Sequence, residues 1–424
     1  MRKIVSLLLT LCLCLSSLAA LAAQEPVTLS FACWGSVEES TRPAFEAMVA
    51  AFEAKYPHIK VEMTGYPYND VQSQLLIQAA GGTPPDVAQC APIWVASLAE
   101  MDALCSMDEL FDEAAMGDYY PGACSGTTIG GKRMSIPWNI NPVCLFYNKA
   151  LLAKAGYDHA PATWGEMVEM SRAVAALGNN EDCNKLYGMT LSTKLLFGAG
   201  YFFLLNVWQH GGEFVDESGN VVLNSPQTVA AFEEARDLIA EGVVAGGLEV
   251  KENRNLFALG QAAFHFDLPS IVKLMADTSP KGQAFLEDFA IAQCPGQDGP
   301  EGISFSSDHH MVVFKDSPHR EEAALFVDFI TGAEGMKIYT DNGVTVLPAR
   351  ASVEGNDFYK TLDDKAGVFF KVLPVTRGLP VQSSSFIQAC EAIITGVQRV
   401  CINGEDAAAV VAETDAAIKE LYGQ

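Results

Sequence analysis

The first quarter of the chain alternates between segments with strand-like and helix-like hydrophobic spacing. Apolar residues recur every second position in the strand-like segments and every three to four positions in the helix-like ones. In order, these patterns predict a strand at Val27–Cys33, a helix at Pro43–Tyr56, a strand at Ile59–Thr64, a helix at Asp70–Ala80 and a strand at Asp86–Gln89. This β-α-β-α-β order is typical of a parallel, doubly wound sheet.

Ligands of such sheets bind beyond the carboxyl ends of the strands. Here those ends are Trp34-Gly35-Ser36, Tyr66-Pro67-Tyr68 and Ala91-Pro92-Ile93-Trp94, and each carries an aromatic residue. The sequence therefore places aromatic side chains where a ligand would lie.

Further helices and strands follow after Tyr147. Thr163 and Glu166 form a capping box at the start of a helix, and Ser225-Pro226 starts another. The predicted helices are Ala150–Gly156, Trp164–Leu177, Gln227–Glu241, Glu321–Thr331, Ile387–Val400 and Asp406–Leu421; the predicted strands lie within Ala258–Phe266, at Phe289–Ala292 and at Met311–Phe314. With no repeat and no low-complexity linker, we expect domains joined by ordered crossings.

The N-terminus has the features of a secretory leader. Arg2 and Lys3 precede an apolar run, Ile4–Leu18, and Ala20-Leu21-Ala22 provides a small-residue cleavage signal. Residues 1–23 are therefore predicted to be a cleaved signal peptide, without a lipoprotein signal, that exports the protein to the periplasm or beyond. A retained N-terminal anchor is the alternative.

The net charge and the cysteine content restrict the classes of function that the chain can have. The formal net charge is -25 at pH 7, which disfavours binding to nucleic acid and to anionic membranes. Nine of the eleven cysteines follow the predicted leader, and no pair has C-x-x-C spacing. Most lie in apolar contexts, so we expect mostly unpaired, buried thiols.

Motifs that could carry catalysis or metal binding lack the necessary context. Gly126–Lys132 matches G-x-x-x-x-G-K but is followed by Arg133 and a strand, so a β-hairpin with a Gly-Gly turn is expected there. His309 and His310 would face opposite sides of a strand, so they could not readily bind one metal ion together. Either one of them faces a ligand cleft, or the two are an ordinary pair of surface residues. We therefore predict no catalytic residue, no metal site and no cofactor.

Aromatic placement gives a positive indication of function. A Trp ring can stack on the apolar face of a sugar while Asn, Asp and Arg bind its hydroxyl groups. The alternative is ordinary packing of loops against the core. The aromatic residues predicted to lie mostly in loops are Trp34, Tyr66, Tyr68, Trp94, Trp138 and Trp208.

The chain resembles the extracytoplasmic solute-binding proteins of bacterial ABC importers, in the carbohydrate-binding, maltose-binding-protein-like group. The resemblance spans nearly the whole mature chain. The segments that carry it are Leu29–Ser36, Gly81–Val87, Ile136-Pro137, Leu145–Leu152, Ala155–Tyr157, Pro161–Trp164, Gly260–Phe264 and Asn403–Ala408. The combination of Tyr147-Asn148-Lys149 with Thr163-Trp164 is its most specific part.

The resemblance implies an α/β, two-lobed periplasmic-binding-protein fold. Each lobe would be a sheet flanked by helices, with the ligand in the cleft between them and closure about a hinge on binding. Crossings near Tyr147, Ser304 and Leu347 would give lobe one as residues 24–147 plus 304–346 and lobe two as 148–303 plus 347–424.

The predicted ligand-binding residues combine the family resemblance with local chemistry. They are Trp34, Ser36, Tyr68, Asp86, Trp94, Trp138, Asn139, Trp208, Asp267, His309 and Arg377. The chain also departs from the family pattern, with Ser270 where a sugar-stacking Trp is usual, Phe264 where Met is common and Ser306–His309 in place of a Gly-Gly turn. These departures favour a small ligand or one that is not a sugar.

The sequence thus predicts a monomeric binding protein that delivers a mono- or oligosaccharide to an ABC permease. Glycerol-phosphate, a polyamine or another polar solute is the alternative ligand. An exported hydrolase or lyase is a third interpretation, but no convergent catalytic groups support it.

Overall fold

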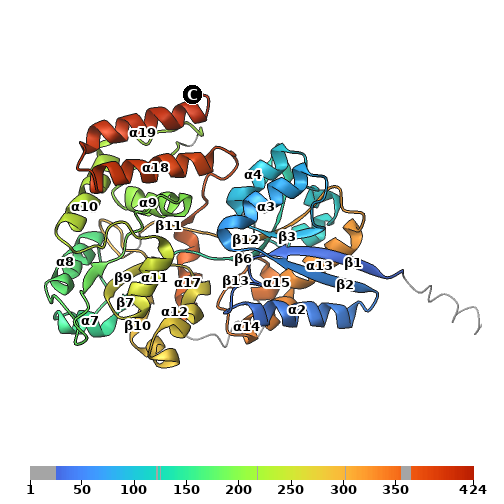
Figure 1. Ribbon diagram of the computed structural model, residues 1–424, viewed down its shortest axis with the longest axis horizontal. Coiled ribbons are helices and arrows are strands. Elements are labelled where there is room, and N and C mark those ends of the chain that lie inside the picture. The colour runs from blue at the N-terminus through green and yellow to red at the C-terminus, as the bar shows by residue number, and fades with distance from the viewer. Residues whose placement is uncertain (1–24, 121–122, 125, 217, 301, 355–363) are drawn as a thin grey trace, which may run out of the picture.

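The computed structural model describes residues 25–120, 123–124, 126–216, 218–300, 302–354 and 364–424. The predicted leader, residues 1–23, lies outside the described residues. The described residues form two lobes side by side, each a sheet flanked by helices (Figure 1). The predicted fold class is confirmed.

Lobe one is built on a six-stranded sheet in the order β13-β6-β12-β3-β1-β2. The strands are β1 (Val27–Cys33), β2 (Ile59–Gly65), β3 (Val87–Cys90), β6 (Ile136–Ile140), β12 (His309–Val313) and β13 (Leu347–Pro348). β1 pairs in parallel with β2 and β3, as the β-α-β-α-β pattern predicts, whereas β12 runs antiparallel to β3 and β6. The carboxyl ends of β1, β2 and β3 therefore meet at one edge.

Helices cover both faces of this sheet because each buries one apolar stripe. The helix α2 begins with a proline in its first turn and buries Phe45, Met48 and Phe52. The helices of lobe one are α2 (Arg42–Lys55), α3 (Tyr68–Ala80), α4 (Pro92–Glu100), α5 (Glu113–Met116), α13 (Arg320–Thr331), α14 (Ala333–Asp341) and α15 (Ala351–Glu354).

Lobe two contains a four-stranded sheet in the order β10-β7-β9-β8. Its strands are β7 (Cys144–Asn148), β8 (Tyr187–Met189), β9 (Ala262–Asp267) and β10 (Phe289–Ala292). Its helices are α7 (Lys149–Lys154), α8 (Trp164–Ala175), α9 (Phe197–Gln209), α10 (Pro226–Ala240), α11 (Val250–Ala258), α12 (Val272–Thr278), α17 (Asp364–Val372), α18 (Phe386–Cys401) and α19 (Ala407–Leu421).

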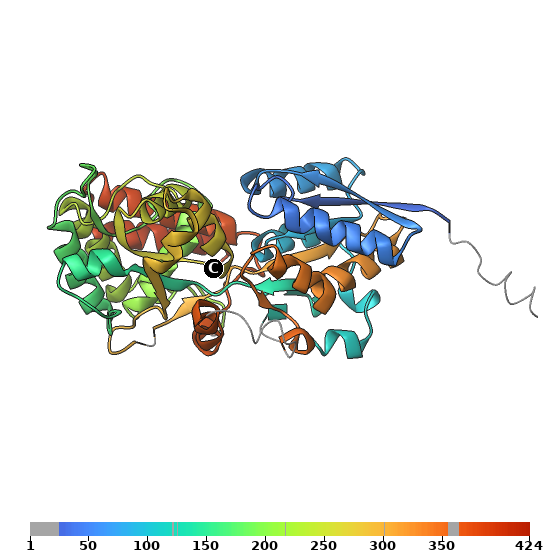
Figure 2. The same cartoon turned by 90° about the horizontal axis from the view of Figure 1, so that it is seen from below.

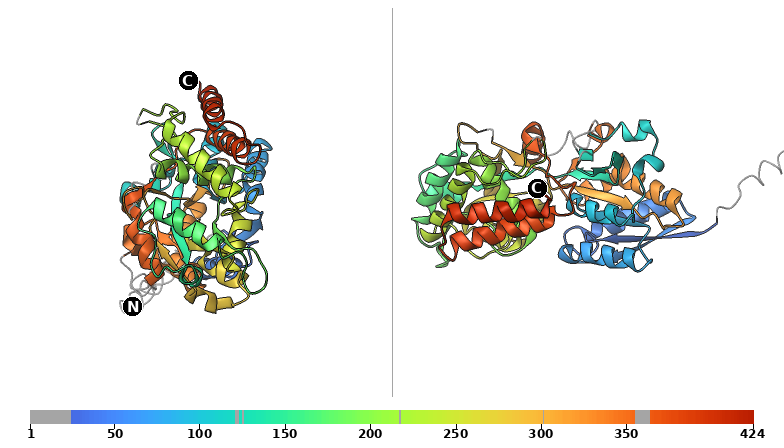
Figure 3. Two further views of the ribbon diagram at one scale, coloured as in Figure 1. Left: turned by 90° about the vertical axis from the view of Figure 1, so that its left-hand side faces the viewer. Right: turned by 90° about the horizontal axis from the view of Figure 1, so that it is seen from above.

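The C-terminal helices α18 and α19 run alongside each other on the outside of lobe two (Figure 3). Helix α9 packs closely against α18. A Cβ atom on Gly200 would lie 2.1 Å from the backbone oxygen of Cys390, so only glycine permits this approach.

The second crossing between the lobes lies near Ser304, as predicted, whereas the first and third predicted boundaries differ from the observed sheets. β7 already belongs to the sheet of lobe two, so the first crossing is at residues 141–143, before Tyr147. The second contains β11 (Ser304–Phe305), which pairs in parallel with β14 (Thr376–Arg377). β13 still belongs to the sheet of lobe one, so the chain does not leave lobe one at Leu347 as predicted. Figure 2 shows the chain around the first crossing, coloured green, running between the two lobes.

Several local predictions can be checked directly. Thr128–Ile129 and Lys132–Arg133 form an antiparallel hairpin whose turn residues, Gly130 and Gly131, have φ of 58° and 79°. The predicted hairpin is confirmed. The cysteines at the nine described positions are free thiols, and seven of them are buried.

None of the described helices is long and apolar enough to cross a membrane. Within the same part of the chain, no cluster of three His, Cys, Asp or Glu side chains is arranged to hold a metal ion.

Candidate ligand-binding cleft

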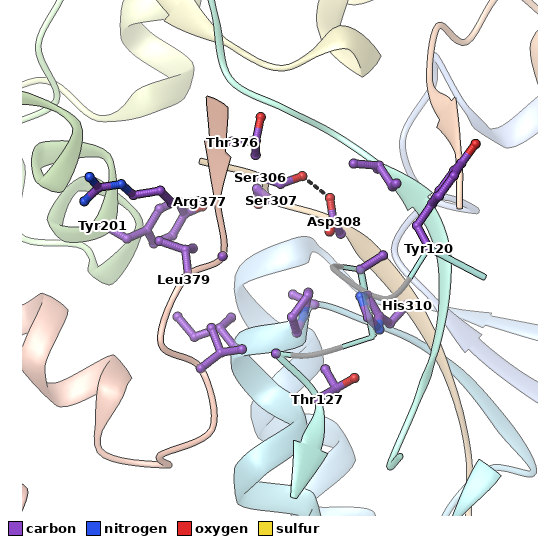
Figure 4. Close-up of a pocket in the computed structure, with 18 of the residues that line it drawn as sticks. Tyr120, Thr127, Tyr201, Ser306, Ser307, Asp308, His310, Thr376, Arg377 and Leu379 are labelled. Carbon is purple, nitrogen blue, oxygen red and sulfur yellow. Dashed lines mark hydrogen bonds between the residues drawn. The ribbon is translucent and has the colours of Figure 1, made fainter. Parts of the chain in front are cut away.

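Two adjoining cavities lie between the lobes. The larger, of ≈ 610 Å³, is lined by Trp34, Glu38 and Asn69 from lobe one and by Lys251, Arg254 and Ser270 from lobe two, among others; we call it the polar chamber. The smaller, of ≈ 490 Å³, is lined by Ile93, Ile140, Asp308, His310, Arg377 and Leu379, among others; we call it the hinge chamber (Figure 4). Both volumes are typical of small-molecule sites.

An aromatic cluster forms the lobe-one side of the polar chamber. The ring of Trp34 meets those of Tyr68, Trp94 and His309 edge to face, with centroid separations of 5.3, 5.6 and 4.9 Å. The turn after Trp34 depends on Gly35, because a Cβ there would lie 2.0 Å from the Phe45 ring. The cluster therefore holds Trp34 rigidly at the chamber wall.

A buried ion pair forms part of the lobe-two side. Arg254 donates through Nε and Nη2 to the two carboxylate oxygens of Asp267, at 2.5 and 2.9 Å. His265 Nε2 lies 2.8 Å from the same carboxylate. Burial raises the pKa of Asp267, but Arg254 and His265 more than offset it, so that pKa lies well below its ordinary value. Asp267 thus stays ionised and orients Arg254.

Carboxylates and cations both line the polar chamber. Glu38 and Glu249 share its lining with Lys251 and Arg254, and Asp267 adds a carboxylate that pairs with Arg254. Desolvation raises the pKa of Glu38, and the positive charges of Arg254 and Lys251 oppose that rise. Desolvation also lowers the pKa of His309 to about 4, so its ring is neutral at pH 7. Such a site favours a neutral, polar ligand over a strongly charged one.

The hinge chamber contains a carboxylate that joins two crossings. The Asp308 Oδ1 atom accepts from the Asn141 backbone N–H at 2.9 Å and from the Ser306 hydroxyl (Figure 4). Burial raises the pKa of Asp308 to about 6. On the same wall, His310 Nδ1 lies 2.8 Å from Ser135 Oγ, while its Nε2 has no partner among the described residues.

Four of the predicted ligand-binding residues line a chamber. Trp34 and His309 line the polar chamber, Arg377 lines the hinge chamber, and Tyr68 lines both. Arg377 comes from β14 and pairs with Glu213. These residues come from the ends of β1 and β2 and from the crossings, as expected for an interlobe site.

Three other predicted residues lie in the core of lobe one. Asp86 accepts from Ser30 N and Oγ, each at 2.7 Å, and from Ser317 Oγ at 2.5 Å. Trp138 is 0% exposed and donates through Nε1 to the Ile330 carbonyl at 3.0 Å. Asn139 is also fully buried and accepts from Asn141 Nδ2. Their prediction as ligand contacts is corrected, because sheet and helix cover them.

The remaining four lie near the chambers without lining them. Ser36 turns back to donate to the Cys33 carbonyl at 3.3 Å. Trp94 lies within α4, beneath Trp34 and Tyr68, and Trp208 lies within α9 near Phe305. Asp267 acts through Arg254. Trp94 and Trp208 were predicted in loops, and both occupy buried helix faces instead.

Sequence reasoning missed Glu38, Tyr201 and Arg254. Tyr201 lies in Phe197–Gln209, where apolar residues surround the whole helix and leave no amphipathic period to detect. Arg254 precedes its partner Asp267 by thirteen positions, a separation that no local pattern encodes. Glu38 follows the first strand and could have been found by extending the loop after Trp34.

The geometry is that of a protein that encloses a small molecule between two lobes. A family model described as bacterial extracellular solute-binding protein matches residues 36–337. The chain belongs to this family. The match covers more than half of the chain and includes parts of both lobes, and it agrees with the resemblance inferred from the sequence.

Individual relatives of this solute-binding protein agree with the family assignment. A probable ABC transporter-binding protein of Deinococcus radiodurans is 25% identical over 396 residues, covering 90% of each chain. The maltose-bound MalE3 of T. maritima has a TM-score of 0.81 and 25% identity, covering 93% of this chain and 100% of its own. The acarbose-binding GacH receptor of Streptomyces glaucescens has the same fold, with a TM-score of 0.82 and 21% identity over 94% of this chain and 99% of its own.

Proposed function

We propose that this solute-binding protein captures a carbohydrate in the interlobe cleft and delivers it to the membrane permease of an ABC importer. The observation that carries the proposal is the lining of the polar chamber, which combines Trp34 from lobe one, Arg254 and Lys251 from lobe two, and amide and hydroxyl side chains such as Asn69 and Ser270. Sugars need this combination, because their rings have apolar faces and hydroxyl edges.

The charge balance of the chamber favours a sugar over the alternative ligands. A glycerol-phosphate site would need an excess of cations, but Glu38 and Glu249 match Lys251 and Arg254 in number. A polyamine site would need several carboxylates without cations nearby, whereas Glu38 and Glu249 share the chamber with Lys251. The maltose-bound MalE3 and the GacH receptor in complex with acarbose, both similar in structure to this chain, support a carbohydrate as the ligand class.

Ligand capture would work by hinge closure. Ligand contacts from Trp34 in lobe one and Arg254 in lobe two are both satisfied only when the lobes are together, so bound ligand stabilises the closed form. The first two crossings, at residues 141–143 and around β11, are short segments at element ends, which is where hinges absorb backbone rotation.

The remaining parts of the proposal concern the cellular context. We infer that residues 1–23 direct export and are then removed, that the mature protein acts as a monomer, and that closure presents both lobes to the permease. The proposed role is capture and release of an unaltered ligand, without catalysis.

A thermal-shift screen tests the ligand class. Neutral mono- and oligosaccharides, glycerol-phosphate and polyamines would be compared, because a ligand that binds only the folded form raises its melting temperature. We expect a shift of the melting temperature with at least one saccharide. A shift with glycerol-phosphate or a polyamine, and with none of the saccharides, would reject the carbohydrate proposal.

Recovery of the bound sugar tests the absence of catalysis. The stabilising saccharide would be incubated with the protein, released by denaturation and analysed by mass spectrometry. We expect it to be unaltered, whereas turnover would show that the protein is a hydrolase or lyase.

A further inference from the structure

Three residues line both chambers: Tyr68, Tyr201 and Ser307. They come from different parts of the molecule, since Tyr68 begins α3 in lobe one, Tyr201 lies in α9 of lobe two and Ser307 lies in the second crossing. They therefore stand where the polar chamber meets the hinge chamber, as a boundary built from both lobes and the hinge.

Direct interactions connect the three side chains. The phenol groups of Tyr68 and Tyr201 interact across the cleft, and the Tyr201 hydroxyl also interacts with the Ser307 side chain. The backbone N–H of Ser307 donates to the Asn141 carbonyl at 3.0 Å, which fixes Ser307 to the first crossing. We call Tyr68, Tyr201 and Ser307 the partition.

Packing from behind makes the two tyrosines rigid. The Tyr68 ring contacts Trp34 and Trp94 with centroid separations of 5.3 and 5.0 Å. The Tyr201 ring meets Phe305 edge to face at 5.7 Å and lies 5.2 Å from Phe202. A ring supported in this way cannot swing aside without disturbing its neighbours.

The two sides of the partition differ in chemistry. The polar chamber contains Glu38, Lys251 and Arg254, which can bind hydroxyl groups. Apolar side chains such as Ile93, Ile140 and Leu379 make up much of the hinge chamber. A saccharide in the polar chamber could extend into the hinge chamber only by passing Tyr68 and Tyr201.

We propose that the partition sets the length of the saccharide that this protein accepts, by confining the ligand to the polar chamber. The inference rests on the proposed carbohydrate function. Tyr201 and Tyr68 are then specificity-determining residues, and the chain-length limit comes from a steric wall and not from a lack of further cavity volume.

The test compares chain-length preference in wild-type protein and in variants of the partition. Isothermal titration calorimetry would measure dissociation constants for homologous series of one to five units: maltooligosaccharides, cellooligosaccharides and chitooligosaccharides. For the series that binds, wild-type protein should show a sharp loss of affinity above a limiting length. Tyr201→Ala should bind the next longer saccharide at least about tenfold more tightly than wild type does, equivalent to ~1.4 kcal/mol.

Two further variants separate a partition from a general structural role. Tyr201→Phe keeps the ring and removes only the hydroxyl group, so the length limit should stay unchanged. Tyr68→Ala opens the partition from lobe one and should raise the limiting saccharide length as Tyr201→Ala does. It replaces Tyr201→Ala in the test if that variant does not fold. A structural defect would weaken binding of every length, whereas an opened partition strengthens binding of the longer saccharides alone.

The outcomes distinguish this inference from the proposed function. Saccharide binding with the same length limit in wild type, Tyr201→Ala and Tyr68→Ala would overturn the partition and leave carbohydrate capture in place. Equal affinity of wild type for all lengths would also overturn it. Failure of every saccharide to bind would overturn the proposed function and this inference with it.

Discussion

Replacing Trp138 with alanine should destabilise lobe one strongly, although Trp138 itself does not line the ligand cleft. The residue lies in β6, is 0% exposed and lines neither chamber. Its ring packs against Phe45 and Tyr339, with centroid separations of 5.4 and 4.6 Å. Its loss would therefore open a cavity between the sheet and the helices α2 and α14.

The magnitude follows from these contacts. Truncation of a buried Trp to Ala typically costs about 3–5 kcal/mol, because apolar contacts are lost and the cavity refills only partly. The Ile330 carbonyl, which accepts from Trp138 Nε1 at 3.0 Å, would lose its partner. Trp138→Phe keeps much of the ring and loses this hydrogen bond, so it should cost only roughly 1–2 kcal/mol.

Urea unfolding followed by far-UV circular dichroism measures both variants without depending on Trp fluorescence. The urea concentration at the midpoint of unfolding of lobe one should be highest for wild type, lower for Trp138→Phe and lowest for Trp138→Ala. Saccharide affinity, corrected for the folded fraction, should change less than about threefold. A loss of stability below about 1 kcal/mol together with lost saccharide binding would refute the reasoning and assign Trp138 to the ligand surface.

Three further predictions concern charge and thiol chemistry. Asp267→Asn should lower the free energy of unfolding by about 3 kcal/mol, because it leaves Arg254 without its buried partner. Since the pKa of Asp267 is held low, this loss of stability, measured by chemical unfolding, should be constant from about pH 5 to 8. A loss that vanishes near neutral pH would contradict the prediction. Asp308→Asn should stabilise the protein above pH 6 by on the order of 1–3 kcal/mol, because the raised pKa of about 6 means that ionisation of Asp308 opposes folding. The stability of wild type relative to the variant should therefore fall as the pH rises from about 4 to 6 and then level off. A rise of that relative stability over the same pH range would refute the assignment. Cys183 is the exposed thiol among the nine described, so a thiol reagent should label it first in the native protein, while fast labelling of buried Cys90 or Cys390 would contradict the packing.

The sequence predicted the lobe-one sheet well because its elements are regular. The strand at Val27–Cys33 was found at its observed limits, and the helix over Pro43–Tyr56 was found within one residue at each end. Alternation in the strand and the 3.6-residue period in the helix are local properties of the chain. The hairpin at Gly130-Gly131 was predictable for the same reason, because two positive φ angles require glycine.

The site was harder to predict because exposure is set by distant parts of the chain. Trp34 follows strand β1 and Trp138 lies within strand β6. Trp34 nevertheless lines a chamber, whereas α14 and the Phe45 ring cover Trp138. Similarly, Asp86 was expected in the cleft, but Ser30 and Ser317 enclose it in the core. Which polar groups face the ligand depends on the packing of both lobes, and no local period encodes that.

The most direct test of the central claim is calorimetric titration of the leader-free protein with the saccharide that raises its melting temperature most. We expect saturable binding with one saccharide per protein, weakened at least about tenfold by Trp34→Ala while the variant remains folded. Binding that Trp34→Ala leaves unchanged, or heat of binding only from a phosphate ester or a polyamine, would contradict carbohydrate capture in the polar chamber.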